Sequence, residues 1–192
     1  MIEMINNLQA APTRKHDAGG KSRLKWPSCS SVTARFSVCE RYRYELSEVW
    51  DSNKPLLLWI LMNPSVANLD HSDPTLIKTG KYSRAWGFGG QLVGNVHAYR
   101  ATNSNDMLKI DDPVGPENDN ALVEMAKRSK LIVLGFGIPP KKLSQRGIHV
   151  AKLLAKIHDL HYLKLNIDGS PSHPLYLPAN LQPQKFIKAI SP

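Results

Sequence analysis

The sequence predicts an α/β domain of three layers, in which helices cover both faces of a short, mostly parallel sheet of four strands. Four short apolar runs alternate with segments of helical character, a pattern typical of parallel βαβ units. The length of 192 residues suits a single domain. Because the chain contains no run of eighteen apolar residues, we expect no membrane-spanning helix and no membrane partner.

The amino-terminal part of the chain differs in composition from the rest. Residues 1–27 are rich in Asn, Gly, Lys and Arg and predict a flexible basic arm, which either tracks DNA or is a solvated tail without function. Residues 28–192 are expected to form the single domain. From Ala34 to Trp50, aromatic and β-branched residues alternate with charges. This alternation predicts strands that flank the main sheet and have one solvent-exposed face.

The four apolar runs are the expected core strands. They cover residues 56–62, 91–97, 131–136 and 161–165. Their continuous apolar character is typical of strands that are buried on both faces. Helices are expected between them, from Asp73 to about Trp86, from 117–119 to Arg128 and from 144–145 to Ile157. Asp73 can cap the first of these helices, and Pro74 suits its first turn.

The charge of the chain favours an anionic partner. The formal net charge is +9 and the isoelectric point is near 9.6, and nucleic acid is the commonest partner of a basic soluble domain. Cys29 and Cys39 are too few for an iron–sulfur cluster and lack the spacing of a zinc site, so both are expected to be reduced thiols. Because neither a secretory signal nor a nucleotide-binding glycine motif is found, we expect a cytoplasmic monomer without metal or organic cofactor.

Polar side chains stand at the ends of the expected strands. Asn63 follows the first strand, Asn95 lies in the second and His173 follows the fourth. Because the carboxyl ends of parallel strands share one rim, we expect these three side chains to line one pocket. The simpler alternative is that Asn63 stops a strand and His173 shapes a loop. A buried Asn95 without partners costs about 1–3 kcal/mol, however, and needs a ligand or a network.

Five motifs occur in order along the chain. They are Leu61–Ala67, Asp73–Thr75, Trp86–Gly87, Asp112–Asn118 and His173–Leu177. Together they resemble the bacterial family known as domain of unknown function 1643, over about residues 34–180. The family name states no activity.

The order of four features also resembles the uracil-DNA-glycosylase-like enzymes. An Asn-Pro motif begins at Asn63, Asn95 lies near the end of the next strand, Gly135 lies near the end of an apolar strand, and a His-Pro motif begins at His173. This resemblance implies the uracil-DNA-glycosylase-like fold, and an enzyme that flips a base out of DNA and cuts its N-glycosidic bond. It further implies that Asn63 positions water, Asn95 reads the base edge and His173 stabilises the departing base anion.

The chain departs from the uracil-specific pattern at two positions. Asn63 stands where those enzymes have an aspartate, and Ser65 stands where a tyrosine crowds C5 of the pyrimidine. Because Ser65 opens that side, the resemblance implies a C5-substituted pyrimidine as the target. The alternative is that Tyr99 or Phe136 refills the space and restores a preference for uracil.

The resulting hypothesis is a DNA glycosylase that removes a modified, C5-substituted pyrimidine, in repair or in defence against phage DNA. The expected base-binding residues are Pro64, Ser65, Asn95, Tyr99 and Phe136. Phosphate contacts are expected from Arg100, Lys141, Lys142 and Arg146. The lysines and Arg146 alternatively form a solvated charged face. Two rival functions stay open: a non-catalytic nucleic-acid-binding module of the same fold, and a hydrolase or transferase of free nucleosides.

Overall fold

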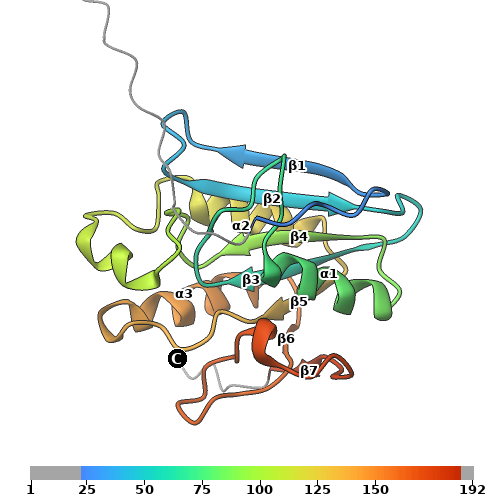
Figure 1. Cartoon of the computed structure of the whole chain (residues 1–192). Coiled ribbons are helices and arrows are strands. Elements are labelled where there is room, and N and C mark those ends of the chain that lie inside the picture. The colour runs from blue at the N-terminus through green and yellow to red at the C-terminus, as the bar shows by residue number, and fades with distance from the viewer. Residues whose placement is uncertain (1–22, 187–192) are drawn as a thin grey trace, which may run out of the picture.

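The computed structural model describes residues 23–186, which form seven strands, three α-helices and three short 3₁₀-helices (Figure 1). Residues 1–22, most of the predicted basic arm, lie outside the described residues. Residues 23–27, the part of the predicted arm that the structure describes, lie against the loop before the first helix. Leu24 and Ser72 exchange two backbone hydrogen bonds, and Trp26 Nε1 donates to the Asn68 carbonyl at 3.0 Å.

The seven strands form one sheet in the order β1-β2-β4-β3-β5-β6-β7, which runs from top to bottom in Figure 1. Their bounds are β1 (Ser31–Phe36), β2 (Arg43–Val49), β3 (Leu56–Leu61), β4 (Gly90–Asn95), β5 (Leu131–Leu134), β6 (Leu160–Tyr162) and β7 (Gln184–Lys185). The four neighbours β4, β3, β5 and β6 are mutually parallel. The hairpin of β1 and β2 pairs antiparallel with β4, and β7 pairs antiparallel with β6.

The expected parallel core is confirmed, whereas the expected sheet of four strands is too small. The four expected core strands are β3 to β6, and the β1–β2 hairpin continues the same sheet. Because β2 lies between β1 and β4, and α-helical segments contact it from both sides, its charged residues Arg43 and Glu48 are buried. The prediction that the strands from Ala34 to Trp50 have one solvent-exposed face is therefore wrong for β2.

Helices cover both faces of the sheet, as expected. α1 (Pro74–Ala85) packs on one face, and α2 (Asn118–Lys127) and α3 (Ser144–Leu154) pack on the other. Trp59 and Ile60 are neighbours on β3 and point into these two separate cores. The predicted cap of α1 is confirmed, because Asp73 Oδ1 accepts from the Leu76 backbone N–H at 2.9 Å. α3 ends at Leu154, three residues earlier than predicted.

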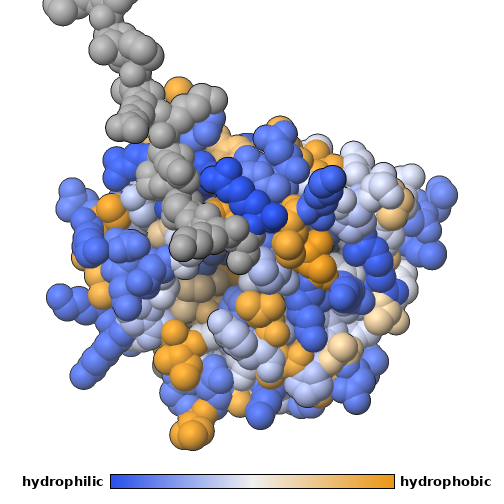
Figure 2. Space-filling view, viewed as in Figure 1, coloured by the Kyte–Doolittle hydropathy of each residue, from blue (hydrophilic) through white to orange (hydrophobic). Residues whose placement is uncertain are grey.

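The short helices lie in the loops that follow the parallel strands. η1 (Ser104–Lys109) follows β4, η2 (Lys141–Leu143) follows β5 and η3 (Pro174–Tyr176) follows β6. In the part of the chain that the structure describes, no helix has the length and apolar character needed to cross a membrane. The face shown in Figure 2 is largely hydrophilic, with small and separate hydrophobic patches.

A buried polar network joins β2 to α1. Glu48 Oε1 accepts hydrogen bonds from Arg84 Nη2 at 2.8 Å and from Ser30 Oγ at 2.7 Å, and its Oε2 accepts one from Gln91 Nε2 at 2.7 Å. The Arg84 guanidinium also lies 3.8 Å from the centre of the Trp50 ring. Both carboxylate oxygens are therefore satisfied, as a buried charge requires.

We expect Glu48→Ala to lower the free energy of unfolding by about 3 kcal/mol, because Arg84 loses its counter-ion and Gln91 loses one of its acceptors inside the protein. Urea unfolding followed by circular dichroism measures the change. The matched control is Glu45→Ala on the same strand. Its pair with Arg128 is partly exposed, so the expected loss is less than about 1 kcal/mol. Equal losses in the two variants would contradict the role given to the network.

Candidate functional site

A cavity of about 280 Å³ opens at the carboxyl ends of the parallel strands. β4 lies on one side of β3, and the later strands β5 and β6 lie on the other side, so the strand order reverses at β3. Open α/β sheets bind ligands where the strand order reverses. The loops after β3, β4 and β6 supply the walls. The residues with polar or aromatic side chains that line this cavity are Arg43, Asn63, Ser65, Asp73, Thr75, Asn95, Thr102, His173 and Tyr176.

Asn63 is held by backbone carbonyls at the edge of this cavity. Its Nδ2 donates to the Ala101 carbonyl at 2.6 Å and to the Pro64 carbonyl at 3.1 Å. Carbonyls only accept, so the amino group must face them and Oδ1 must point the other way. No described residue hydrogen-bonds to Oδ1, which leaves it as an acceptor for a water molecule or a ligand.

Asn95 lies beside Asn63 because β3 and β4 are parallel, with Leu61 aligned to Asn95. Asn95 is almost fully buried, and its Oδ1 accepts from Arg43 Nη2 at 3.4 Å. A guanidinium only donates, so this contact sets the direction of the amide. Its Nδ2 has no partner among residues 23–186. A ligand that satisfies Nδ2 must present an acceptor, such as the carbonyl oxygen or ring nitrogen of a base.

His173 reaches the cavity because two glycines allow its segment to approach the end of β5. A Cβ at Gly135 would lie 3.0 Å from Pro174 Cδ, and one at Gly137, where φ is +74°, would lie 3.4 Å from His173 Cβ. His173 Nδ1 is buried without a partner in the described part of the chain. Burial lowers the pKa of His173, although the Asp73 carboxylate acts in the opposite direction. The imidazole is therefore neutral at pH 7 and can donate one hydrogen bond.

The wall around Ser65 combines hydroxyl groups with an exposed aromatic ring. Ser65 Oγ lies 3.4 Å from Thr102 Oγ1. Tyr176 is 83% exposed, and its ring centre lies 5.7 Å from that of His173. Aromatic rings in such positions can stack on a nucleic-acid base.

Two other expected base-binding residues, Pro64 and Tyr99, do not line this cavity. Pro64 contributes only its carbonyl, which accepts from Asn63. Tyr99 belongs to the core on the α2 side of the sheet, where its ring meets the edge of Tyr42 with the ring centres 6.0 Å apart. Tyr99 therefore does not join Asn63 and Asn95 in the cavity, and its ring does not refill the space beside Ser65.

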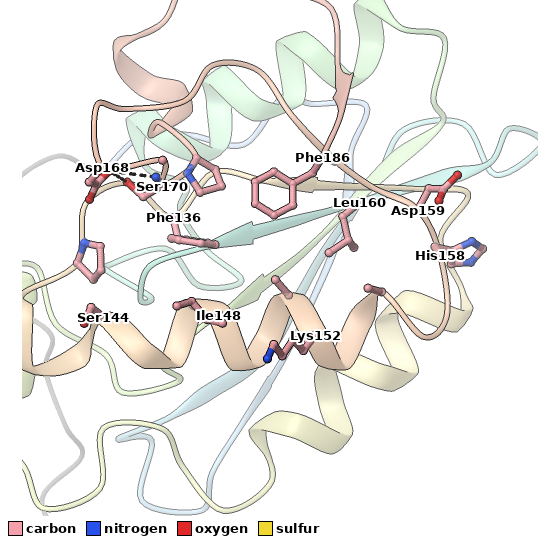
Figure 3. A pocket seen from close by; sticks show the side chains of 16 residues that line it. Phe136, Ser144, Ile148, Lys152, His158, Asp159, Leu160, Asp168, Ser170 and Phe186 are labelled. Atoms are coloured by element: carbon pink, nitrogen blue, oxygen red, sulfur yellow. Dashed lines mark hydrogen bonds between the residues drawn. The ribbon is translucent and has the colours of Figure 1, made fainter. Parts of the chain in front are cut away.

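Phe136 lines a second cavity, of about 350 Å³, between α3 and the carboxyl-terminal segment. Figure 3 shows Phe136 and Phe186 on one side of this cavity and Ile148 and Lys152 of α3 on the other. Phe136 packs so closely on α3 that a Cβ at Gly147 would lie 2.9 Å from its ring. Phe136 therefore lies outside the cavity that holds Asn63, Asn95 and His173.

The expected phosphate contacts divide into two groups. Lys141 and Lys142 are exposed on η2, beyond the end of β5. Arg146 is held within the protein by the Asp119 carboxylate and by a backbone carbonyl at 2.7 Å. Arg100 is buried and donates to a backbone carbonyl of the turn between β1 and β2 at 3.0 Å. Only the two lysines therefore keep the exposure that a phosphate contact needs.

Five of the polar and aromatic side chains of the cavity were not among the predicted site residues: Arg43, Asp73, Thr75, Thr102 and Tyr176. Tyr176 stands in the motif His173–Leu177, three residues after an expected catalytic residue, so its position was a usable signal. Thr102 follows the second core strand and carries no distinguishing pattern. Arg43 gave the opposite signal, because a charge in an alternating strand usually marks a solvent-exposed face.

His97 follows β4 and is buried outside this cavity. Burial, with repulsion from Arg146, lowers the pKa of His97 to about 4. In the unfolded chain His97 takes up a proton near pH 6.5, so the free energy of unfolding falls by about 3 kcal/mol as the pH falls from 6.5 to 4.

We expect His97→Gln to flatten the pH dependence of the unfolding free energy between pH 6.5 and 4, as measured by urea unfolding. An unchanged pH dependence would show that folding does not alter the titration of His97.

Within residues 23–186, no three His, Cys, Asp or Glu side chains are grouped so that they could hold a metal ion. No match to the chain was found among curated proteins or among solved structures. A family model described as a protein of unknown function, DUF1643, matches residues 43–175. This stretch begins at Arg43 and includes Asn63, Asn95 and His173. Because the match covers more than half of the chain, the protein belongs to the DUF1643 family.

Proposed function

We propose that this protein is a DNA glycosylase of the uracil-DNA-glycosylase-like fold, which removes a C5-substituted pyrimidine and leaves an abasic site. The observation that carries the proposal is the meeting of Asn63, Asn95 and His173 in one cavity, from segments that are far apart in the sequence. A cavity of about 280 Å³ suits a single base that has been flipped out of DNA. In this proposal the protein acts on DNA as a cytoplasmic monomer, in repair or in defence against phage.

The three side chains have complementary tasks in this reaction. Asn95 Nδ2 donates to an acceptor on the edge of the base. Asn63 Oδ1 accepts a hydrogen bond from the water that attacks C1′ of the sugar. An amide does not remove a proton at neutral pH, so the water adds to a sugar that already has oxocarbenium character. Neutral His173 donates to the base while negative charge develops on it.

The environment of Ser65 supports a substituted pyrimidine as the target. Ser65 and Thr102 present hydroxyl groups to the cavity, and both Tyr99 and Phe136 lie elsewhere. A polar substituent at C5, such as a hydroxymethyl group, can hydrogen-bond to these hydroxyls. The exposed ring of Tyr176 adds a surface on which a base can stack.

The charge of the protein supports DNA rather than free nucleosides as the substrate. The net charge is +9, and Lys141 and Lys142 are exposed at the carboxyl-terminal rim of the sheet. Lysines at such a rim can contact phosphates and fix the position of the DNA without reading its sequence. An enzyme that acts on free nucleosides does not need a surface that contacts a phosphate backbone.

The test is incubation with DNA that carries uracil, thymine or a C5-substituted cytosine at one position, in single and double strands, followed by alkali. Alkali cleaves abasic sites, so the expected result is strand breaks at the substituted cytosine alone. Binding to these DNAs without any break would favour the non-catalytic module. Release of bases from free nucleosides and none from DNA would favour the nucleoside hydrolase. Either of these outcomes contradicts the proposal.

A further inference from the structure

Arg43 places a buried positive charge in the wall of the cavity. Its Nη1 donates to the Ala67 carbonyl at 2.9 Å and its Nη2 donates to Asn95 Oδ1 at 3.4 Å. Its Nε has no hydrogen-bond partner among the described residues. Arg43 also forms no ion pair with any carboxylate of residues 23–186. The guanidinium therefore keeps an unused donor and an unpaired charge.

Such a buried charge is unfavourable unless a ligand offsets it. Burial lowers the pKa of Arg43 to about 10, with attraction to Asp73 opposing the shift and repulsion from Arg100 adding to it. The side chain is therefore still protonated at neutral pH. Asp73 lines the same cavity, but its Oδ1 caps α1. The protein thus holds a permanent cation where the proposed base would lie.

We propose that Arg43 is a catalytic residue that contacts the base and stabilises the pyrimidine anion as it leaves the sugar. This inference rests on the proposed function, because it assigns a role within that reaction. When the bond between C1′ and N1 breaks, its electron pair stays on the base and spreads over the ring nitrogens and carbonyl oxygens. Water forms the new bond to C1′ and loses a proton to solvent, and the base anion takes up a proton from solvent.

The charge of Arg43 favours the transition state over the bound substrate. The base is neutral before cleavage and becomes anionic as the bond breaks, so a fixed cation gains most of its attraction during the reaction. Asn63 offers no general base that could make the water a stronger nucleophile, so the departure of the base limits the rate. His173 supplies the dipole of one neutral N–H, whereas Arg43 supplies a whole charge.

The test is the single-turnover rate of base release on DNAs whose target cytosine carries methyl, fluoro or formyl at C5, in order of increasing electron withdrawal. Arg43→Met is expected to lower the rate for the methyl compound by on the order of 10³-fold. The loss is expected to shrink along the series, because a better leaving group needs less stabilisation. Arg43→Lys keeps an ionisable amine but loses the planar fork that donates to two acceptors, so its rate is expected to fall between those of Arg43→Met and the unmodified protein.

A structural defect would lower the rates on all three substrates by the same factor. A loss that does not depend on the C5 substituent, or no loss at all, would therefore overturn the role of Arg43 and leave the proposed function standing. Arg100→Met is the control, since Arg100 is also buried but does not line the cavity, and its substituent dependence should match the unmodified protein. Failure of the unmodified protein to release any base would overturn the proposed function and this inference with it.

Discussion

His173→Ala is expected to slow base release by on the order of 10²-fold or more, while the affinity for DNA stays nearly unchanged. The imidazole is neutral, and its buried Nδ1 has no partner among residues 23–186, so the ring is available to the departing base. Asn63→Ala should have a comparable effect, because it removes the acceptor that holds the water. The measurements are the single-turnover rate of release and the Kd for the same DNA with a base that the protein does not cleave.

The control for His173→Ala is His149→Ala, which changes an exposed histidine on α3 outside the cavity. This variant should keep both the rate and the affinity. If His173→Ala instead weakened DNA binding as strongly as it slowed release, the cavity would be a binding site without chemistry. The non-catalytic module would then be the better account.

Ser65→Tyr is expected to abolish release of a pyrimidine with a bulky C5 substituent, with a loss on the order of 10²-fold or more. Ser65 lines the cavity beside Thr102, and a tyrosine ring there would occupy the space that the substituent needs. Release of plain uracil should suffer much less. Rates on matched strands with each base measure the difference, and Ser65→Ala is the control that leaves the space open. Preferential release of uracil by the unmodified protein would contradict the substrate assignment.

The parallel core of the fold was predictable because its signals are local. The apolar run of β3 has no alternation, and Asp73 followed by Pro74 marks the start of α1 in the residues themselves. The membership of β2 in the same sheet was not predictable in this way. The alternation of charged and apolar residues in β2 is typical of a strand with one solvent-exposed face. Only the tertiary pairing with β1 and β4 buries Glu48 beside Arg84 and Gln91.

The candidate site could be predicted for those residues whose position is determined by the end of a parallel strand. Parallel pairing brings Asn63 and Asn95 to one rim, and His173 joins them because Gly135 and Gly137 leave room for its loop. Side-chain direction beyond a strand end follows no such rule. Phe136 therefore turns to α3 and the second cavity, although its neighbours in the chain contact the segment of His173.

In the proposed function, this protein cuts an intact base from DNA in the cavity of Asn63, Asn95 and His173. Mass spectrometry of both reaction products tests it most directly. We predict one unaltered free pyrimidine for each abasic site formed, and neither product from the double variant Asn63→Ala, His173→Ala. A base that is altered while still attached to the DNA, or an equal yield from the double variant, would contradict the claim.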